Sequence, residues 1–350
     1  MSGSRFLSVL GVIGVSLVTC EIACRNEGGD PVDWFAIYKL PMRLINESYG
    51  PGLDYLYLDS KSKGWQVSKF LINMTQGAMG RVLEQLYQSY KRNDTAYMLY
   101  NDSPPGMNSS FTDRGHTKGA LLFDRSQGFW LVHSVPHFPP FPEDGFGYPH
   151  TGRRYGQVAL CVTYKYEQFK QIAAQLLYYN PNVYNCSVPD AYHRDLWGLY
   201  RVCQDLPFPW IETTRLAVLE SAQGEFFLNF AKSKYFHDDI VTAWMAQKLQ
   251  TDLLAETWQP TGIEVPSNCT LPRHVYTIKR IKVANHSFYS RQDHSKWCVS
   301  RPRADTWTCI GDLNRYAEQI WRSGGFVCTQ NKLLYSAFSS IVAYYSDCRK

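Results

Sequence analysis

Two short segments of the chain each place a histidine two residues before a lysine. His116 and Lys118 form the first pair (GHTKG, 115–119), and His294 and Lys296 form the second (DHSKW, 293–297). On a strand, residues i and i+2 face the same side, so each segment presents an imidazole and an ammonium together. Imidazoles can act as nucleophile and as acid, and ammonium groups stabilise negative oxygens. This combination suits attack on a phosphodiester without a metal ion.

The repetition of the motif matters more than either copy. Nine histidines and 36 lysines and arginines among 350 residues predict about one H-x-[KR] match by chance. A lone match is therefore most simply a surface histidine beside a solvated lysine. The shared form H-[TS]-K, once in each half of the chain, favours a paired site.

Both pairs are expected on strands. Residues 115–124 and 129–135 have the composition of two strands joined as a hairpin, and 293–299 reads as a short strand. Further strands are predicted at 32–40, 95–100, 157–166, 225–230, 275–283 and 326–329, and helices at 67–90, 167–177, 238–256 and 333–345. Strands and helices alternate in both halves, so the predicted fold class is α/β in layers.

The N-terminus has the features of a signal peptide. Arg5 precedes an apolar run, 6–18, which is too short to span a bilayer. Cleavage is expected after Cys20 or Ala23, which leaves a soluble, lumenal protein. The net charge of +5 and pI near 8.6 suit a polyanionic partner without requiring one. An aromatic content of 15% requires a large core.

Cysteines and glycosylation sequons point to the same compartment. There are ten cysteines and no C-x-x-C pair, so disulfides are expected in an oxidising lumen. Eight N-x-S/T sequons predict an N-glycoprotein. The candidate glycosylation sites are Asn46, Asn73, Asn93, Asn101, Asn108, Asn185, Asn268 and Asn285.

Several segments, the two pairs included, resemble the deoxyribonuclease II family, in order along the chain. They are PVDWF (31–35), YKLP (38–41), YND (100–102), HTKG (116–119), GFWLVHS (128–134), DHSKW (293–297) and GDLNR (311–315). The resemblance runs from Cys24 to Cys348. It implies a phospholipase D-like fold, in which two similar α/β halves of mixed sheets flanked by helices form one central site. The implied division is a signal peptide at 1–23, a first half at 24–179, a connector at 180–214 and a second half at 215–350.

The sequence departs from one part of the superfamily pattern, H-x-K-x4-D. Phe123 stands at the aspartate position of the first motif, with Asp124 one place later, and Arg301 stands there in the second. The aspartate that usually supports the histidine is therefore not in its usual place.

Three further residues are candidates for supporting roles. Asn314 resembles the second conserved polar position, and Ser134 is its counterpart in the first half. His133 is either a third histidine of the site or a structural residue at a strand end.

The resemblance also implies how the cysteines pair. The expected disulfides are Cys24–Cys161, Cys269–Cys348 and Cys309–Cys328, with Cys186–Cys203 as an added local pair. Cys298 is left unpaired.

The activity implied is that of an acid endonuclease that hydrolyses DNA without cofactor or metal and leaves 3′-phosphate ends. His116 is expected to attack phosphorus and form a phosphohistidine, and His294 to protonate the leaving oxygen, although the near-symmetry allows the roles to be exchanged. The neighbouring lysines lower the imidazole pKa values, so an acidic optimum is expected. The resemblance implies a lysosomal hydrolase, with secretion as a second destination. Its substrate is DNA, double-stranded or single-stranded, and it works as a monomer or homodimer.

Three alternatives remain. A metal-dependent nuclease requires clustered carboxylates, but the acidic pair Asp238 and Asp239 fits a helix start better. A phospholipase D-type phosphodiesterase acting on another substrate would share the same site. A non-catalytic secreted glycoprotein on the same fold is disfavoured by the intact pairs in both halves.

Overall fold

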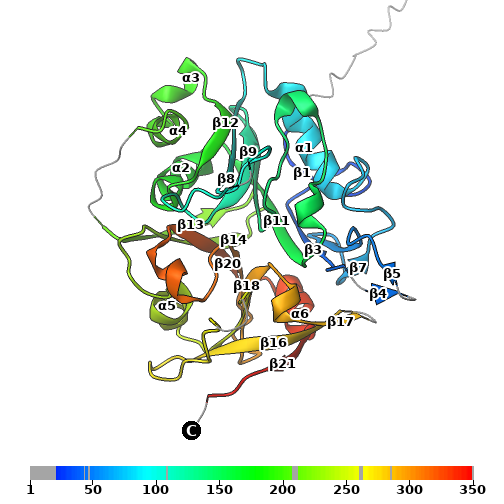
Figure 1. Ribbon diagram of the computed structural model, residues 1–350. Helices are drawn as coiled ribbons and strands as arrows, with labels where there is room; N and C mark the ends of the chain where they lie inside the picture. Colours follow the sequence, from blue (N-terminus) through cyan, green and yellow to red (C-terminus); the bar gives the residue numbers. More distant parts are fainter. Residues whose placement is uncertain are drawn as a thin grey trace, which may run out of the picture.

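The computed structural model describes residues 21–42, 44–45, 48–107, 109–206, 212–259, 263–283 and 286–348. Two large sheets with flanking helices form the molecule, so the predicted α/β class is confirmed (Figure 1). The first sheet is antiparallel throughout, in the order β12 (Val183–Ser187), β8 (Ala96–Asn101), β9 (Lys118–Phe123), β10 (Gln127–His133), β11 (Gln157–Lys165), β3 (Trp34–Lys39), β6 (Tyr55–Asp59) and β7 (Gln66–Val67).

The second sheet is mixed, because β15 and β16 run parallel. The expectation of a mixed sheet in each half is therefore wrong for the first sheet, whose strand pairs are all antiparallel. The order of the second sheet is β13 (Thr214–Glu220), β14 (Phe226–Lys232), β20 (Gly324–Thr329), β19 (Thr308–Gly311), β18 (Lys296–Ser300), β15 (Leu253–Thr257), β16 (Val275–Val283) and β17 (His286–Tyr289), with β21 (Val342–Tyr345) also on β16. Two small ribbons pair β1 (Cys24–Arg25) with β2 (Pro31–Val32) and β4 (Leu44–Ile45) with β5 (Ser48–Tyr49).

Five strands of each sheet share one order. The arrangement β8-β9-β10-β11-β3 of the first sheet matches β15-β18-β19-β20-β14 of the second. Along the chain, β3 and β14 come first in their series, and the other four strands follow in the order given. A helix follows the final strand of each series, β11 in the first sheet and β20 in the second. The two H-x-K segments therefore lead into equivalent strands, β9 and β18.

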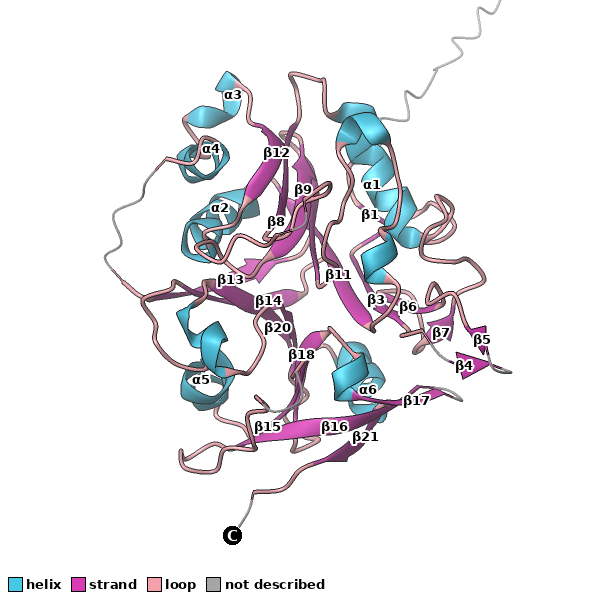
Figure 2. Ribbon diagram, in the orientation of Figure 1, coloured by secondary structure: helices cyan, strands magenta, loops and turns pink. Residues whose placement is uncertain are grey.

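Helices cover both faces of each sheet. In the view of Figure 2 the first sheet lies in the upper part and the second in the lower part. Between them, α2 (Gln168–Tyr179) and α6 (Lys332–Ser340) pack in one core shared by both sheets. The outer faces are covered by α1 (Ala78–Ser89) and by a π-helical turn, η3 (Ile240–Met245), that continues into α5 (Ala246–Leu249). Burial on both faces explains why strands such as β11 are almost continuously apolar.

Shorter helical elements lie in the connections. They are η1 (Pro142–Asp144), η2 (His150–Gly152), α3 (Asp190–His193), α4 (Trp197–Cys203), η4 (Ser290–Gln292) and η5 (Ala317–Trp321). Among the described residues, no helix combines the length and apolar character that a membrane crossing requires.

Three helix predictions need correction. The helix expected at 67–90 covers only α1, because the residues before Gly77 form turns. The helix expected at 238–256 ends at Leu249, where Gln250 adopts a left-handed conformation (φ 55°), and Glu256 lies in strand β15. The helix expected at 333–345 ends at Ser340, and the residues after it form β21. The predicted β9–β10 hairpin is confirmed.

The stretch 180–214, expected as a connector, contributes β12 to the edge of the first sheet and also contains α3 and α4. All four expected disulfides are present: Cys24–Cys161, Cys186–Cys203, Cys269–Cys348 and Cys309–Cys328. Cys298 is buried and unpaired, as expected.

The sequons differ in exposure. Asn73 and Asn93 are exposed, and Asn185 and Asn268 are half-buried. Asn101 is fully buried, and its side-chain amide donates to the carbonyls of Val135 (3.0 Å) and Phe138 (2.8 Å), so the prediction of a glycan there is wrong. Asn46, Asn108 and Asn285 lie outside the described residues, as does 1–20 of the expected signal peptide.

Candidate active site

Both His/Lys pairs line a single cavity of about 650 Å³ between the two sheets. Lys118 is the first residue of β9 and Lys296 the first of β18, so the equivalent ends of two equivalent strands meet there. The prediction that both members of each pair lie on a strand is wrong for the histidines, because His116 and His294 lie two residues before these strands begin. Each lysine is buried, whereas each histidine is half-buried. The structure thus brings together two pairs of side chains that lie far from each other in the sequence.

His116 is held in one tautomer by the second half of the chain. Its backbone N–H donates to the carbonyl of Ser323 (2.9 Å), and its Nδ1 lies 2.6 Å from the carbonyl oxygen of Asp312. A carbonyl only accepts, so Nδ1 carries the proton and Nε2 has a free lone pair when the ring is neutral. Gly115 allows this approach, because a Cβ there would overlap the carbonyl of Tyr179.

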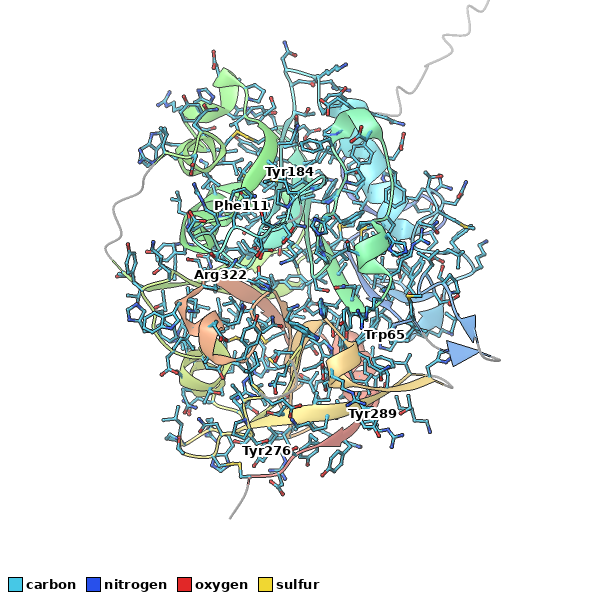
Figure 3. All side chains as sticks on the ribbon, in the orientation of Figure 1. Trp65, Phe111, Tyr184, Tyr276, Tyr289 and Arg322 are labelled. Carbon is cyan, nitrogen blue, oxygen red and sulfur yellow. A yellow bond between two sulfur atoms is a disulfide. The ribbon has the colours of Figure 1, made fainter. Side chains whose placement is uncertain are left out.

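The buried carboxylate of Asp102 lies close to two cations and to one of the two histidines. It forms an ion pair with Lys118, lies 3.1 Å from Nη2 of Arg322, and lies 3.9 Å from Nε2 of His116. Burial opposes its charge, but Lys118, His116 and Arg322 together hold the pKa of Asp102 well below its ordinary value. Arg322 also donates to the carbonyl of Phe111 (3.2 Å), and Figure 3 shows it where the two halves meet.

His294 has different surroundings. Its ring stacks on Tyr155 (centroids 4.2 Å apart, planes 7° apart) and contacts Trp258 (4.3 Å, 59°). Its backbone N–H donates to the carbonyl of Gly156 (2.9 Å), whereas its buried Nε2 has no hydrogen-bond partner among the described residues. Burial, and then the charge of Lys296, lower the pKa of His294 to about 2.

The two lysines place positive charge in the cavity, part of which Asp102 offsets through its ion pair with Lys118. Burial, followed by repulsion from Lys118, lowers the pKa of Lys296 to about 7. Its Nζ donates to the backbone carbonyl of His294. The pKa of His116 is also well below the ordinary value, because of burial and then Lys118. An anion bound in the cavity would relieve this repulsion and raise all these pKa values.

At equivalent positions, one half has charged side chains where the other has aromatic ones. Asp102 directly follows β8, and Trp258 directly follows the matching strand β15. Arg322 and Tyr155 stand at matching places before β20 and β11. One histidine therefore lies against an ion-paired carboxylate and guanidinium, and the other between two aromatic rings. The backbone is nearly symmetric, but the two imidazoles are not equivalent.

A comparison with known proteins decides the family. Residues 23–348 match the family model of deoxyribonuclease II. The chain belongs to the deoxyribonuclease II family. Deoxyribonuclease-2-beta of Homo sapiens is 52% identical, over 98% of this chain and 95% of its own. Deoxyribonuclease-2-alpha of Sus scrofa is 38% identical (94% and 91%), and plancitoxin-1 of Acanthaster planci is 34% identical (98% and 97%). The resemblance found in the sequence is thus confirmed.

The beta relatives are more similar to this chain than the alpha relatives. The segments CRNE (24–27) and NPNVY (180–184) also favour the beta branch of the deoxyribonuclease II family.

The candidate supporting residues differ in position. Asn314 and Ser134 both line the cavity, and Oδ1 of Asn314 is buried with no partner among the described residues. Ser134 Oγ donates to Gln157 Oε1 (2.5 Å) and accepts from the N–H of Val158 (2.9 Å). His133 does not line the cavity. Burial and then Lys118 lower its pKa to about 3.

Four neighbours of the histidines were missed in the sequence: Asp102, Arg322, Tyr155 and Trp258. Asp102 could have been found, since it ends the family-like segment YND and is a carboxylate. The two aromatic residues carry no signal in a chain so rich in them. Within the described residues, three or more His, Cys, Asp or Glu side chains nowhere gather closely enough to hold a metal ion.

Proposed function

We propose that this protein hydrolyses phosphodiester bonds of DNA at acidic pH without a divalent metal, and that the two His/Lys pairs carry out the reaction. The observation that carries the proposal is the single cavity lined by both pairs in a member of the deoxyribonuclease II family. Acid endonuclease activity on DNA follows from that family and from its named relatives. The roles of the individual residues are our inference from the geometry.

In the first step, Nε2 of His116 attacks phosphorus. A P–N bond forms, the bond from phosphorus to the 5′ oxygen breaks, and His294 gives that oxygen its proton. In the second step, water attacks phosphorus while His294 takes up a proton. The P–N bond then breaks and a 3′-phosphate remains. Lys118 and Lys296 contact the non-bridging oxygens, where negative charge accumulates.

The surroundings of His116 favour it as the nucleophile. Donation of Nδ1–H to the Asp312 carbonyl leaves the lone pair on Nε2, and His116 lines the same cavity as Lys118. Phosphorylation makes the imidazole cationic, and the carboxylate of Asp102, 3.9 Å away, stabilises that charge.

The surroundings of His294 explain a requirement for acid. In the free protein its depressed pKa keeps it neutral. A bound phosphodiester anion raises this pKa, and low pH supplies the proton that the leaving oxygen needs. Activity should therefore fall as the pH rises.

The matching five-strand order supports a phospholipase D-like architecture with halves at 24–179 and 215–350. A role in the lysosome, with secretion as a second destination, is in keeping with acid chemistry and four disulfides. DNA is the partner expected for the electropositive cavity.

The test is cleavage of supercoiled plasmid from pH 4 to 8 in excess EDTA, for wild type, His116→Ala and His294→Ala. His193→Ala, on the distant α3, is the matched control. We expect wild type and the control to cut only at acidic pH, both site variants to lose at least about a hundredfold in rate, and the products to carry 3′-phosphates. Loss of wild-type cleavage in EDTA, or near-normal cleavage by either site variant, would disprove the mechanism.

A further inference from the structure

A second cavity, of about 810 Å³, lies beside the catalytic one at the junction of the two halves. We call it the seam pocket; Arg154, Tyr155, Arg291, Gln292 and His150 are among the residues that line it. Tyr155 connects the two cavities, because it lines the seam pocket while its ring stacks on the catalytic His294. None of the described residues that line this pocket is acidic.

The two arginines are placed by one contact between the halves. Gly156 and Asp293 form a parallel bridge, in which Gly156 N–H donates to the carbonyl of Gln292 (2.9 Å). Arg154 lies two residues before Gly156, and Arg291 lies two residues before Asp293. The bridge therefore brings both guanidinium groups to the same cavity.

A buried lysine fixes the backbone that carries Arg154. Lys39 is 1% exposed, and its ammonium donates to the carbonyls of Arg153 (2.8 Å) and Tyr155, on either side of Arg154. Tyr155 is thereby directed inward to His294, and Arg154 stays exposed. The loop that carries Arg154 is therefore held in place by the buried ammonium of Lys39.

The arginines of the seam pocket are not neutralised. Among the described residues neither Arg154 nor Arg291 forms an ion pair. By contrast, Arg114 makes two bonds of 2.6 Å to the carboxylate of Asp205, and Arg322 pairs with Asp102. The two seam-pocket arginines therefore carry positive charge that no carboxylate of the described residues offsets by an ion pair.

We propose that the seam pocket binds a second phosphate of the DNA strand whose scissile phosphate lies between His116 and His294. The inference rests on the proposed function, which places that phosphate in the neighbouring cavity. A nucleic-acid strand is a polyanion with phosphates at regular short intervals. Guanidinium groups bind phosphate oxygens in pairs and with little dehydration cost, so two unpaired arginines beside the reaction centre suit the next phosphates along the strand.

The experiment compares two substrates, a duplex oligonucleotide and bis(4-nitrophenyl) phosphate, which has a single phosphodiester and cannot reach the seam pocket. Arg154→Ala/Arg291→Ala is measured with wild type between 50 and 200 mM NaCl. The control is Arg81→Ala/Arg303→Ala, which removes two exposed arginines from α1 and from the β18–β19 turn and so changes the net charge equally. Arg154→Lys/Arg291→Lys keeps the charge.

For the duplex we expect kcat/KM of the alanine variant to fall about tenfold at low salt, mainly through KM. The slope of log kcat/KM against log salt concentration should become less steep by about one, since each phosphate contact contributes about 0.9 to the slope. The lysine variant should keep most of the slope. Hydrolysis of the small diester should be unchanged, because the catalytic cavity is intact.

A duplex salt slope equal to that of the control variant would overturn the proposal. Equal losses on both substrates would also overturn it, because the arginines would then support the catalytic geometry instead. The proposed function is tested separately: if wild type in EDTA fails to cut either substrate, the two-histidine mechanism fails. The salt slope measured for duplex binding still decides the seam pocket in that case.

Discussion

Replacement of Asp102 by asparagine tests how the site stabilises charge on His116. The two side chains have nearly the same shape, so the change removes one negative charge and little else. The carboxylate lies 3.9 Å from Nε2 of His116. At an effective dielectric constant of about 20, a pair of unit charges at that distance interacts by about 4 kcal/mol. Lys118 and Arg322 share the carboxylate, so the part available to a phosphohistidine is smaller.

We therefore expect Asp102→Asn to lower kcat by about a hundredfold to a thousandfold, equivalent to about 3–4 kcal/mol. The loss should appear on both duplex DNA and bis(4-nitrophenyl) phosphate, because it concerns the reacting group. KM should change little.

The same substitution should weaken the fold. Breaking a buried ion pair costs roughly 3–5 kcal/mol, because its cations are left uncompensated. The pKa of Asp102 is held below the ordinary carboxyl value, so its stabilisation is present above about pH 4 and is lost only as pH falls through the lower folded value. Asp102 therefore still stabilises the protein at the acidic pH of its activity.

A double variant separates the two effects. Asp102→Asn with Arg322→Met removes a carboxylate and a cation together, so thermal unfolding should return toward that of wild type while kcat stays low. A folded Asp102→Asn protein with kcat within about tenfold of wild type would refute the reasoning about charge on His116. Recovery of kcat in the double variant would show that Asp102 acts only on stability.

Three further predictions concern other parts of the structure. Tyr155→Leu should admit water to His294, raise its pKa from about 2 toward the ordinary value, and move the optimum of a pH–rate profile upward; an unmoved optimum would contradict the assigned cause. Lys296 loses its proton as the pH rises through about 7, so binding of sulfate, measured by calorimetry, should weaken over that range, and Lys296→Met should abolish this pH dependence. Replacing both Cys186 and Cys203 by serine opens a loop with a sequence separation of 17 and should lower the free energy of unfolding by about 3 kcal/mol, measured by denaturant titration; an unchanged value would mean that β12 and α4 hold without the bond.

The parts of the fold that depend on neighbouring residues could be predicted from the sequence. The β9–β10 hairpin and the strand that begins at Lys296 follow from local alternation and turn residues. Strand β12 could not be predicted in this way, since its partner β8 lies more than 80 residues earlier in the chain. The break at Gln250 also has no local signal, because the left-handed position after the helix is occupied by neither Gly nor Asn, the residues that usually mark it.

The same distinction applies to the site. The His/Lys pairs are visible because each is a local motif, repeated in the other half of the chain. Asp102 and Arg322 meet only when the halves pack together, 220 residues apart in sequence. Tyr155 and Trp258 come from different halves and converge on a histidine of the second. These residues contact the histidines only through tertiary packing, so no spacing in the sequence predicts them.

The segment that carries each histidine is held by the opposite half: the N–H of His116 donates to the carbonyl of Ser323, and the N–H of His294 donates to the carbonyl of Gly156. During synthesis, the chain must be made as far as Ser323, directly before β20, before the first of these bonds can form. A nascent chain, or a fragment cut between the sheets, therefore has no assembled reaction centre. Catalytic activity is therefore expected only once the chain has been made through Ser323 and its two halves have packed together.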